Sequence, residues 1–112
     1  MFLDVSNPEQ FRCEIEPQRE TVRVRPIGEL DLATVPVVEE QLSELHAAGF
    51  TSLTLDLRGV RFLDSTGLDL ILLWDLRSRT DGFEFRIIAG PPAVQRLFDL
   101  TGTTEGLDFG EA

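Results

Sequence analysis

The chain has 112 residues, of which 42% are hydrophobic, and this length supports one domain with one core and no second domain. Its net charge is −10 and all ten basic residues are arginine, so the average surface repels nucleic-acid phosphates and anionic lipids, which argues against direct DNA binding and a membrane partner. There is no basic-then-apolar leader, no apolar run near the ~20 residues that span a bilayer, and only one cysteine, so a cytoplasmic protein is expected.

The N-terminal part of the sequence predicts a tail followed by a hairpin. Residues 1–10 are predicted to be the tail, and the domain is predicted to fill residues 11–112. Hydrophobic and charged side chains alternate over 11–16 and again over 22–25, as they do in half-buried strands. Residues 17–20 read as a turn, so the two strands are expected to pair as an antiparallel hairpin.

Helices and strands alternate over the rest of the chain. A helix is predicted over 34–49, with its threonine as the cap and its glycine as the stop. A strand over 53–57 follows, then a strongly apolar helix that stops at Gly82, a strand over 83–89 and a short helix that starts at Pro91-Pro92. This order predicts one small α/β domain with a mixed, mostly parallel sheet, an N-terminal hairpin and helices packed on the sheet.

Three connecting segments are expected to meet at one edge of this sheet. They are Gly28–Asp31, Phe62–Gly67 and Gly90–Pro92, and each follows a predicted parallel strand. Parallel strands have their carboxyl ends on the same side, where open α/β sheets usually carry their function. Asp31 and Ser65 are therefore predicted to be neighbours in space.

The segment Asp64–Gly67 places two hydroxyl groups at the start of the long apolar helix. Asp64 or Ser65 can serve as its N-cap, and a negative group on Ser65 would meet the positive end of the helix dipole. Ser65 is thus well placed to carry a phosphate. Gly67 would cost roughly 1 kcal/mol relative to alanine in the first turn, and close approach by the backbone of a partner is one reason for a glycine there.

The same segment is part of a pattern that resembles a known family. The run Leu63–Leu68 resembles the signature of the STAS domain, the domain of sulphate transporters and anti-sigma factor antagonists. The segments Gly28–Asp31 and Pro92–Gly102 agree with that family in order and spacing, and the resemblance spans roughly Phe11 to Phe109. Each motif alone is weak evidence, but the three together are specific. In the antagonists the serine directly after the motif's aspartate accepts the phosphate, and by this match it is Ser65.

The resemblance implies a regulatory function without catalysis. The unphosphorylated protein would bind an anti-sigma factor that is also a serine kinase, a GHKL-type ATPase, and so free the sigma factor. Phosphorylation of Ser65 would end the binding, and a metal-dependent serine phosphatase would reset the switch. Two alternatives remain: a STAS subunit of a lipid-transport ABC complex, and an enzyme or nucleotide-binding protein.

The candidate partner-binding residues also have structural interpretations. Asp31 and Asp64 belong to the surface that the resemblance presents to the kinase, and Thr66 and Gly67 complete this set. Ser65 and Asp64 can instead act only as helix caps, and Asp31 as a solvated turn residue. Thr66 is expected to be a supporting hydroxyl rather than a second phosphate acceptor.

No feature of the sequence predicts an active site, a cofactor or a metal. The chain has no glycine-rich phosphate loop and no convincing pair of nucleophile and base, so ATP and magnesium should belong to the kinase. Cys13 shares a strand face with hydrophobic residues and is expected to be a core residue. His46 has no neighbouring ligand cluster, and Trp74 is expected to lie in the core.

Overall fold

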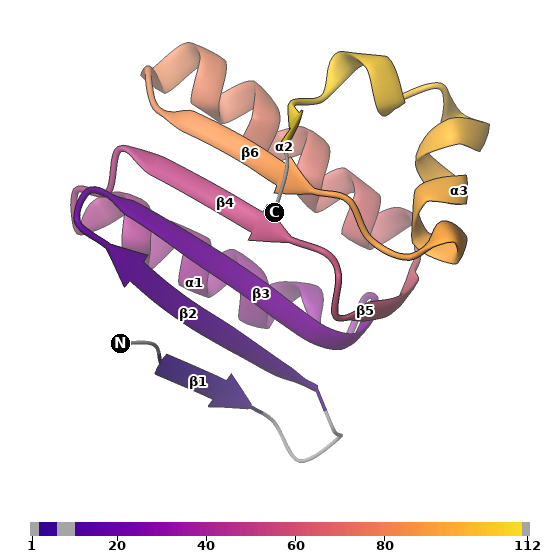
Figure 1. Cartoon of the computed structure of the whole chain (residues 1–112), viewed down its shortest axis with the longest axis horizontal. Helices are drawn as coiled ribbons and strands as arrows, with labels where there is room; N and C mark the ends of the chain where they lie inside the picture. The colour runs from indigo at the N-terminus through magenta and orange to yellow at the C-terminus, as the bar shows by residue number, and fades with distance from the viewer. Residues whose placement is uncertain (1–2, 7–10, 111–112) are drawn as a thin grey trace.

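The computed structural model describes residues 3–6 and 11–110, and this part of the chain contains a seven-stranded sheet and three α-helices (Figure 1). The strands are β1 (Leu3–Ser6), β2 (Arg12–Gln18), β3 (Thr21–Leu30), β4 (Ser52–Asp56), β5 (Val60–Leu63), β6 (Glu84–Ile88) and β7 (Phe109–Gly110). The helices are α1 (Val35–Ala47), α2 (Ser65–Asp81) and α3 (Pro92–Thr101), and a 3₁₀ turn, η1, spans Thr104–Gly106.

The sheet combines an antiparallel N-terminal part with a parallel remainder. Its strand order is β1-β2-β3-β4-β6-β7, and β5 pairs with β3 outside this path. The β1–β2 and β2–β3 pairs are antiparallel, and the other pairs are parallel. The predicted α/β fold with a mixed sheet and an N-terminal hairpin is therefore confirmed.

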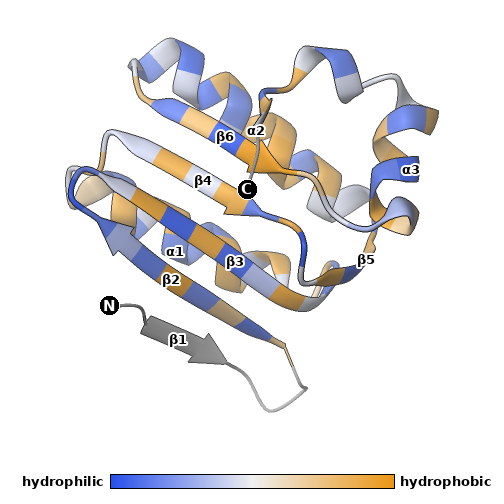
Figure 2. Cartoon of the chain, in the orientation of Figure 1, coloured by the Kyte–Doolittle hydropathy of each residue, from blue (hydrophilic) through white to orange (hydrophobic). Residues whose placement is uncertain are grey.

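The helices α1 and α2 lie behind the sheet in Figure 1 and cover one of its faces. The strands send alternate hydrophobic side chains toward these helices, and the alternation is visible as coloured bands in Figure 2. Trp74 of α2 is fully buried, as predicted, and its Nε1 donates a hydrogen bond of 2.7 Å to Oε2 of Glu39 on α1. The buried strand residues on this face include Cys13, Ile15, Val22, Val24, Leu53, Leu55, Phe85 and Ile87.

The prediction of an N-terminal tail over residues 1–10 is wrong for residues 3–6. Residues Leu3–Ser6 form β1 and pair with β2, so they extend the sheet, while residues 7–10 lie outside the described part. The turn in the structure is also shorter than the turn predicted over residues 17–20. Pro17 and Gln18 still belong to β2 and pair with the start of β3.

The strand β3 changes partners along its length, and this change creates an element that the sequence did not predict. Its first half pairs with β4, and its end pairs with the short strand β5. At the register shift Gly28 has a φ of 120° and donates its N–H to the Gly59 carbonyl at 3.0 Å. Only glycine adopts this conformation readily, because a Cβ would clash with the backbone. Phe62 and Leu63, expected in a loop, belong to β5.

The helix boundaries agree with the sequence within a few residues. The helix α1 ends just before Gly49, and α2 ends at Gly82, which has a left-handed φ of 77°. Thr34 stands at the start of α1 but does not cap it with its side chain. Its hydroxyl instead donates a 2.7 Å hydrogen bond to the Glu29 carbonyl, so it ties the end of β3 to the first turn.

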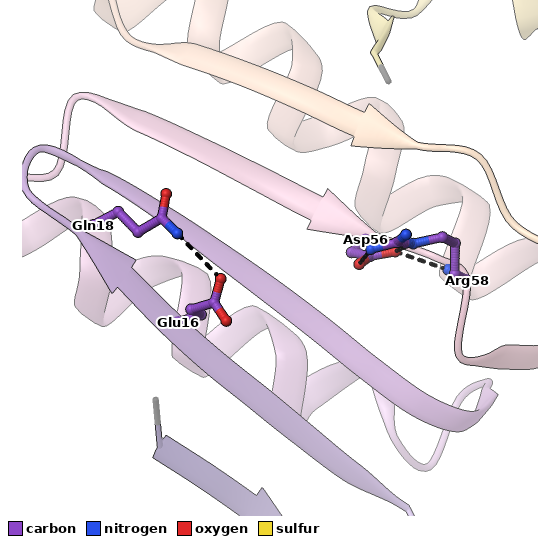
Figure 3. A network of polar contacts seen from close by, with 4 residues as sticks. All are labelled: Glu16, Gln18, Asp56 and Arg58. Carbon is purple, nitrogen blue, oxygen red and sulfur yellow. Dashed lines mark hydrogen bonds and ion pairs between the residues drawn. The ribbon is translucent and has the colours of Figure 1, made fainter. Parts of the chain in front are cut away.

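The open face of the sheet is polar, as Figure 3 shows for two of its hydrogen-bonded pairs. Gln18 donates to Glu16 at 3.3 Å. Asp56 is fully buried and accepts two side-chain hydrogen bonds from Arg58, at 3.0 and 2.8 Å. Burial alone would raise the pKa of Asp56, but these bonds and the backbone N–H of Arg58 outweigh it and hold the pKa below its ordinary value of 3.8. This ion pair fixes the turn from β4 into β5.

Candidate functional site

Asp64 is the centre of the candidate site because it caps α2. It has an extended backbone conformation, and its Oδ1 accepts hydrogen bonds from the Thr66 N–H at 2.9 Å and the Gly67 N–H at 3.1 Å. The Thr66 hydroxyl donates a third hydrogen bond to the same oxygen, at 2.5 Å. The structure therefore selects Asp64 over Ser65 as the N-cap.

These contacts keep Asp64 ionised. The hydrogen bond from the Thr66 hydroxyl is the largest cause that lowers its pKa below 3.8, and the N–H groups of Gly67, Thr66 and Leu32 act in the same direction against partial desolvation. The contribution of Leu32 is informative, since this residue belongs to the segment between β3 and α1. Asp64 thus links two loops that are distant in sequence.

Ser65 is exposed and occupies the first position of α2. Its hydroxyl makes no hydrogen bond within residues 3–6 and 11–110, so nothing in this part of the chain occupies the oxygen that would receive a phosphate. The N–H groups of Thr66 and Gly67 bond to the Asp64 carboxylate, and the Leu68 N–H bonds to the Asp64 carbonyl at 3.1 Å. A phosphate on Ser65 would find the N–H groups of Thr66, Gly67 and Leu68 taken. The expected stabilisation by the helix N-terminus would therefore come from the field of the helix dipole and from the Ser65 N–H, which has no acceptor among the described residues.

Thr66 is half-buried and directs its hydroxyl at Asp64. This geometry fits the supporting role that was expected of it. Its oxygen is engaged in the cap, whereas the oxygen of its neighbour Ser65 has no partner among the described residues. This difference distinguishes two hydroxyl groups that the sequence places side by side.

Asp31 has a clear structural function. Its Oδ1 accepts hydrogen bonds from the N–H groups of Ala33, at 3.0 Å, and Thr34, at 3.2 Å, and so shapes the turn that leads into α1. The residue is half-buried, so it is a turn residue but not the fully solvated one of the structural interpretation. Such a turn forms because a short carboxylate reaches N–H groups two and three residues ahead.

The predicted meeting of the two loops is confirmed. Leu30 and Leu63 are register partners in the parallel β3–β5 pair, so Asp31 and Asp64 follow them side by side. The Asp64 N–H also donates to the Leu30 carbonyl at 3.3 Å. The third segment, Gly90–Pro92, starts α3 beside β5 at the same end of the sheet (Figure 1).

Gly67 is buried, and the structure gives an internal reason for it. A Cβ at this position would collide with Cδ1 of Leu63 and would lie 2.9 Å from the Leu30 carbonyl oxygen. The glycine lets α2 pack closely on β3 and β5. The chain's own strands are therefore sufficient reason for a glycine here, and a contact of Gly67 with a partner stays a prediction.

Two large apolar side chains near the site were missed by the sequence analysis. Leu32 is 74% exposed and directly follows Asp31, and Phe62 is 52% exposed on β5. The sequence carries only a weak signal for this exposure. Leu32 is a leucine inside a turn, and Phe62 is a phenylalanine next to Leu63 in a short strand with one buried face. The exposure of Phe62 cannot be recognised without knowledge of β5.

The described residues hold no group of three or more histidine, cysteine, aspartate or glutamate side chains that could bind a metal ion. His46 packs on Phe83 instead, with 4.4 Å between the ring centroids. Among the helices that the structure describes, none combines the length and the hydropathy required to cross a membrane.

Known proteins with similar sequences and folds agree with this architecture. A family model described as "Mlab, STAS domain" matches residues 13–108. The anti-sigma-B factor antagonist of Staphylococcus aureus is 31% identical over 101 residues, which cover 90% of this chain and 94% of the relative. A crystal structure of an anti-sigma factor antagonist from Mycobacterium paratuberculosis has a TM-score of 0.75 and 26% identity and covers 96% of this chain and 92% of that one. The antagonist SpoIIAA in its unphosphorylated form shares the fold, with a TM-score of 0.74, 24% identity and coverage of 89% and 87%. The chain belongs to the STAS-domain family of anti-sigma factor antagonists.

Proposed function

We propose that this chain is an anti-sigma factor antagonist that is switched by phosphorylation of Ser65. Its unphosphorylated form binds an anti-sigma factor that is also a GHKL-type serine kinase and so releases the sigma factor. The observation that carries the proposal is the exposed Ser65 hydroxyl, which has no hydrogen-bond partner among the described residues and stands beside Asp64 at the start of α2. The name of the Staphylococcus aureus relative supports the class of partner.

The transfer step needs only an accessible hydroxyl from this chain. Ser65 Oγ forms a bond to the γ-phosphorus of ATP, the bond to the β,γ-bridging oxygen breaks, ADP leaves, and the hydroxyl proton passes to a base of the kinase. ATP and magnesium belong to the kinase, which places the reaction in the cytoplasm. The antagonist itself is a regulatory protein and not an enzyme.

The phosphate acts as a switch because the bound surface cannot accommodate it. A phosphoserine adds about −1.5 to −2 charges beside the ionised Asp64. The nearby N–H donors of Thr66 and Gly67 are already bonded to Asp64, so at this end of α2 only the Ser65 N–H could replace part of the water that the phosphate would lose. Burial of such a group costs several kcal/mol, and each ~1.4 kcal/mol weakens binding tenfold.

The switch is reset by removal of the phosphate. We propose that a metal-dependent serine phosphatase acts on the same exposed position, with its metal held by the phosphatase and not by this chain. An exposed phosphoserine at the first position of a helix is accessible without unfolding of the antagonist.

The test combines three variants with the kinase. Wild type, Ser65→Ala and Thr66→Ala are incubated with ATP and, one at a time, with purified GHKL-type serine kinases from the same genome, and phosphate is located by peptide mass spectrometry. Wild type and Thr66→Ala should be labelled on Ser65. Ser65→Ala should bind the kinase, remain unlabelled and stay bound when ATP is added, because only the acceptor oxygen is missing.

Two results would contradict the proposal. Label on Thr66, or continued label on Ser65→Ala, would show that the acceptor is misplaced. Failure of every kinase to bind, together with recovery of ABC-transporter subunits in a pull-down, would favour the transporter alternative. Circular dichroism of each variant checks that the fold is intact.

A further inference from the structure

The loops that carry Ser65 expose an apolar pair. Leu32 is 74% exposed and Phe62 is 52% exposed. The Leu32 N–H is one of the groups that lower the pKa of Asp64, so its backbone lies beside the cap of α2. Phe62 precedes Asp64 by two residues in extended backbone, which places both on the same side of the chain. Leu32 and Phe62 therefore flank the residue before Ser65.

The segments that carry this apolar pair also expose acidic side chains. Glu29 is the register partner of Phe62, and Asp69 follows Ser65 by four residues on the same face of α2. Both are exposed, and neither has an ion-pair partner within the part of the chain that the structure describes. The segments 28–34 and 60–69 together contain four carboxylates, of Glu29, Asp31, Asp64 and Asp69, against the single Arg61.

We infer that Leu32 and Phe62 form the apolar centre, and Glu29 and Asp69 the acidic rim, of the surface that docks the anti-sigma factor. This inference rests on the proposed function and adds the chemistry of the partner: an apolar patch bordered by arginine or lysine side chains. A second copy of this chain does not fit, because a twofold contact would set one acidic rim against another.

The arrangement also explains the direction of the switch. A phosphate within the acidic rim would face the partner's cations and strengthen the complex. A phosphate on Ser65 instead stands next to Asp64, the residue that Leu32 and Phe62 flank, at the edge of the apolar centre of the contact. The loss of hydration there outweighs the long-range attraction, so phosphorylation releases the partner.

The test compares variants of Leu32 and Phe62 with the same substitution at exposed leucines away from the site. Kinetics of binding to the purified GHKL-type kinase that labels Ser65 are measured for wild type, Leu32→Ser, Phe62→Ser, Leu76→Ser and Leu100→Ser. Leu100 is 75% exposed and Leu76 is 55% exposed, which matches the two site residues. Leu76 lies eleven residues after Ser65, which is about 16 Å along α2.

We expect Leu32→Ser and Phe62→Ser each to raise the dissociation constant at least tenfold, mainly through faster dissociation. The two controls should bind like wild type. The double variant Glu29→Gln/Asp69→Asn should slow association several-fold and flatten its dependence on salt. Asp81→Asn, at the other end of α2, removes one exposed charge as the control.

Each failure has its own signature. If wild type binds and Ser65 is labelled but Leu32→Ser and Phe62→Ser bind equally well, or lose no more than Leu76→Ser, the docking surface is overturned and the proposed function stands. If no kinase binds wild type, the proposed function fails first. A dimer in sedimentation velocity that Leu32→Ser dissociates would show that a second copy occupies the surface and would also overturn the inference.

Discussion

Replacement of Gly67 by alanine tests how α2 is held against the sheet. In the middle of a solvated helix this change would stabilise the protein by up to about 1 kcal/mol, because alanine loses less backbone entropy. Here the new Cβ meets Cδ1 of Leu63, the Leu30 carbonyl oxygen at 2.9 Å and the Leu30 Cγ at 3.2 Å. Two of these contacts belong to core side chains, and the third is backbone in the β3–β5 pair, so none yields easily.

The expected magnitude follows from these opposing effects. Overpacking of a core costs about 1–3 kcal/mol, and the gain in helix propensity offsets up to about 1 kcal/mol. Gly67→Ala should therefore lower the free energy of unfolding by about 1–2 kcal/mol. For a domain near this size, 1 kcal/mol corresponds to roughly 4–8 °C in Tm.

The assay is urea unfolding followed by far-UV circular dichroism, with Gly106→Ala as the matched control. Gly106 has no heavy atom within 4 Å of its built Cβ and no left-handed φ, so this variant should stay within about 0.5 kcal/mol of wild type. A Gly67→Ala protein as stable as wild type or more stable would refute the close packing of α2 as the reason for this glycine and would favour the interpretation that a partner requires it.

Three further predictions concern the cap, the turn and the absence of catalysis. Asp64→Asn should destabilise the domain most near neutral pH, because the folded-state pKa of Asp64 lies below 3.8. The contribution of the ionised carboxylate to the free energy of unfolding is complete above 3.8 and is lost as pH falls through the folded-state pKa. Urea midpoints of both proteins across this range should therefore converge in acid. Asp31→Ala should cost about 1 kcal/mol, because the Ala33 and Thr34 N–H groups lose their acceptor, and an unchanged midpoint would make Asp31 a solvated residue. The purified chain with ATP and Mg²⁺ should show no turnover and no mass gain of one phosphate, and either signal would contradict a purely regulatory role.

Much of the site could be read from local patterns. The capping of α2 was predicted because a short polar side chain before an apolar helix reaches N–H groups only two and three residues away. The proximity of Asp31 and Ser65 was predicted from the parallel strands that precede them. The choice between Asp64 and Ser65 as the cap was not predicted, because it depends on the exact path of the backbone.

The sequence by itself determined those features whose physical cause is local: the alternation that makes the hairpin, the apolar periodicity of α2 and the glycine that stops it at residue 82. Only the tertiary structure decided the short strand β5, the burial of Gly67 and the exposure of Leu32 and Phe62. Each of these depends on which distant segment lies alongside, and β3 changes its partner between Val24, its last residue paired with β4, and Gly28, its first residue paired with β5. A pattern along one strand cannot specify such a partner, because the pairing free energy comes from contacts between residues remote in sequence.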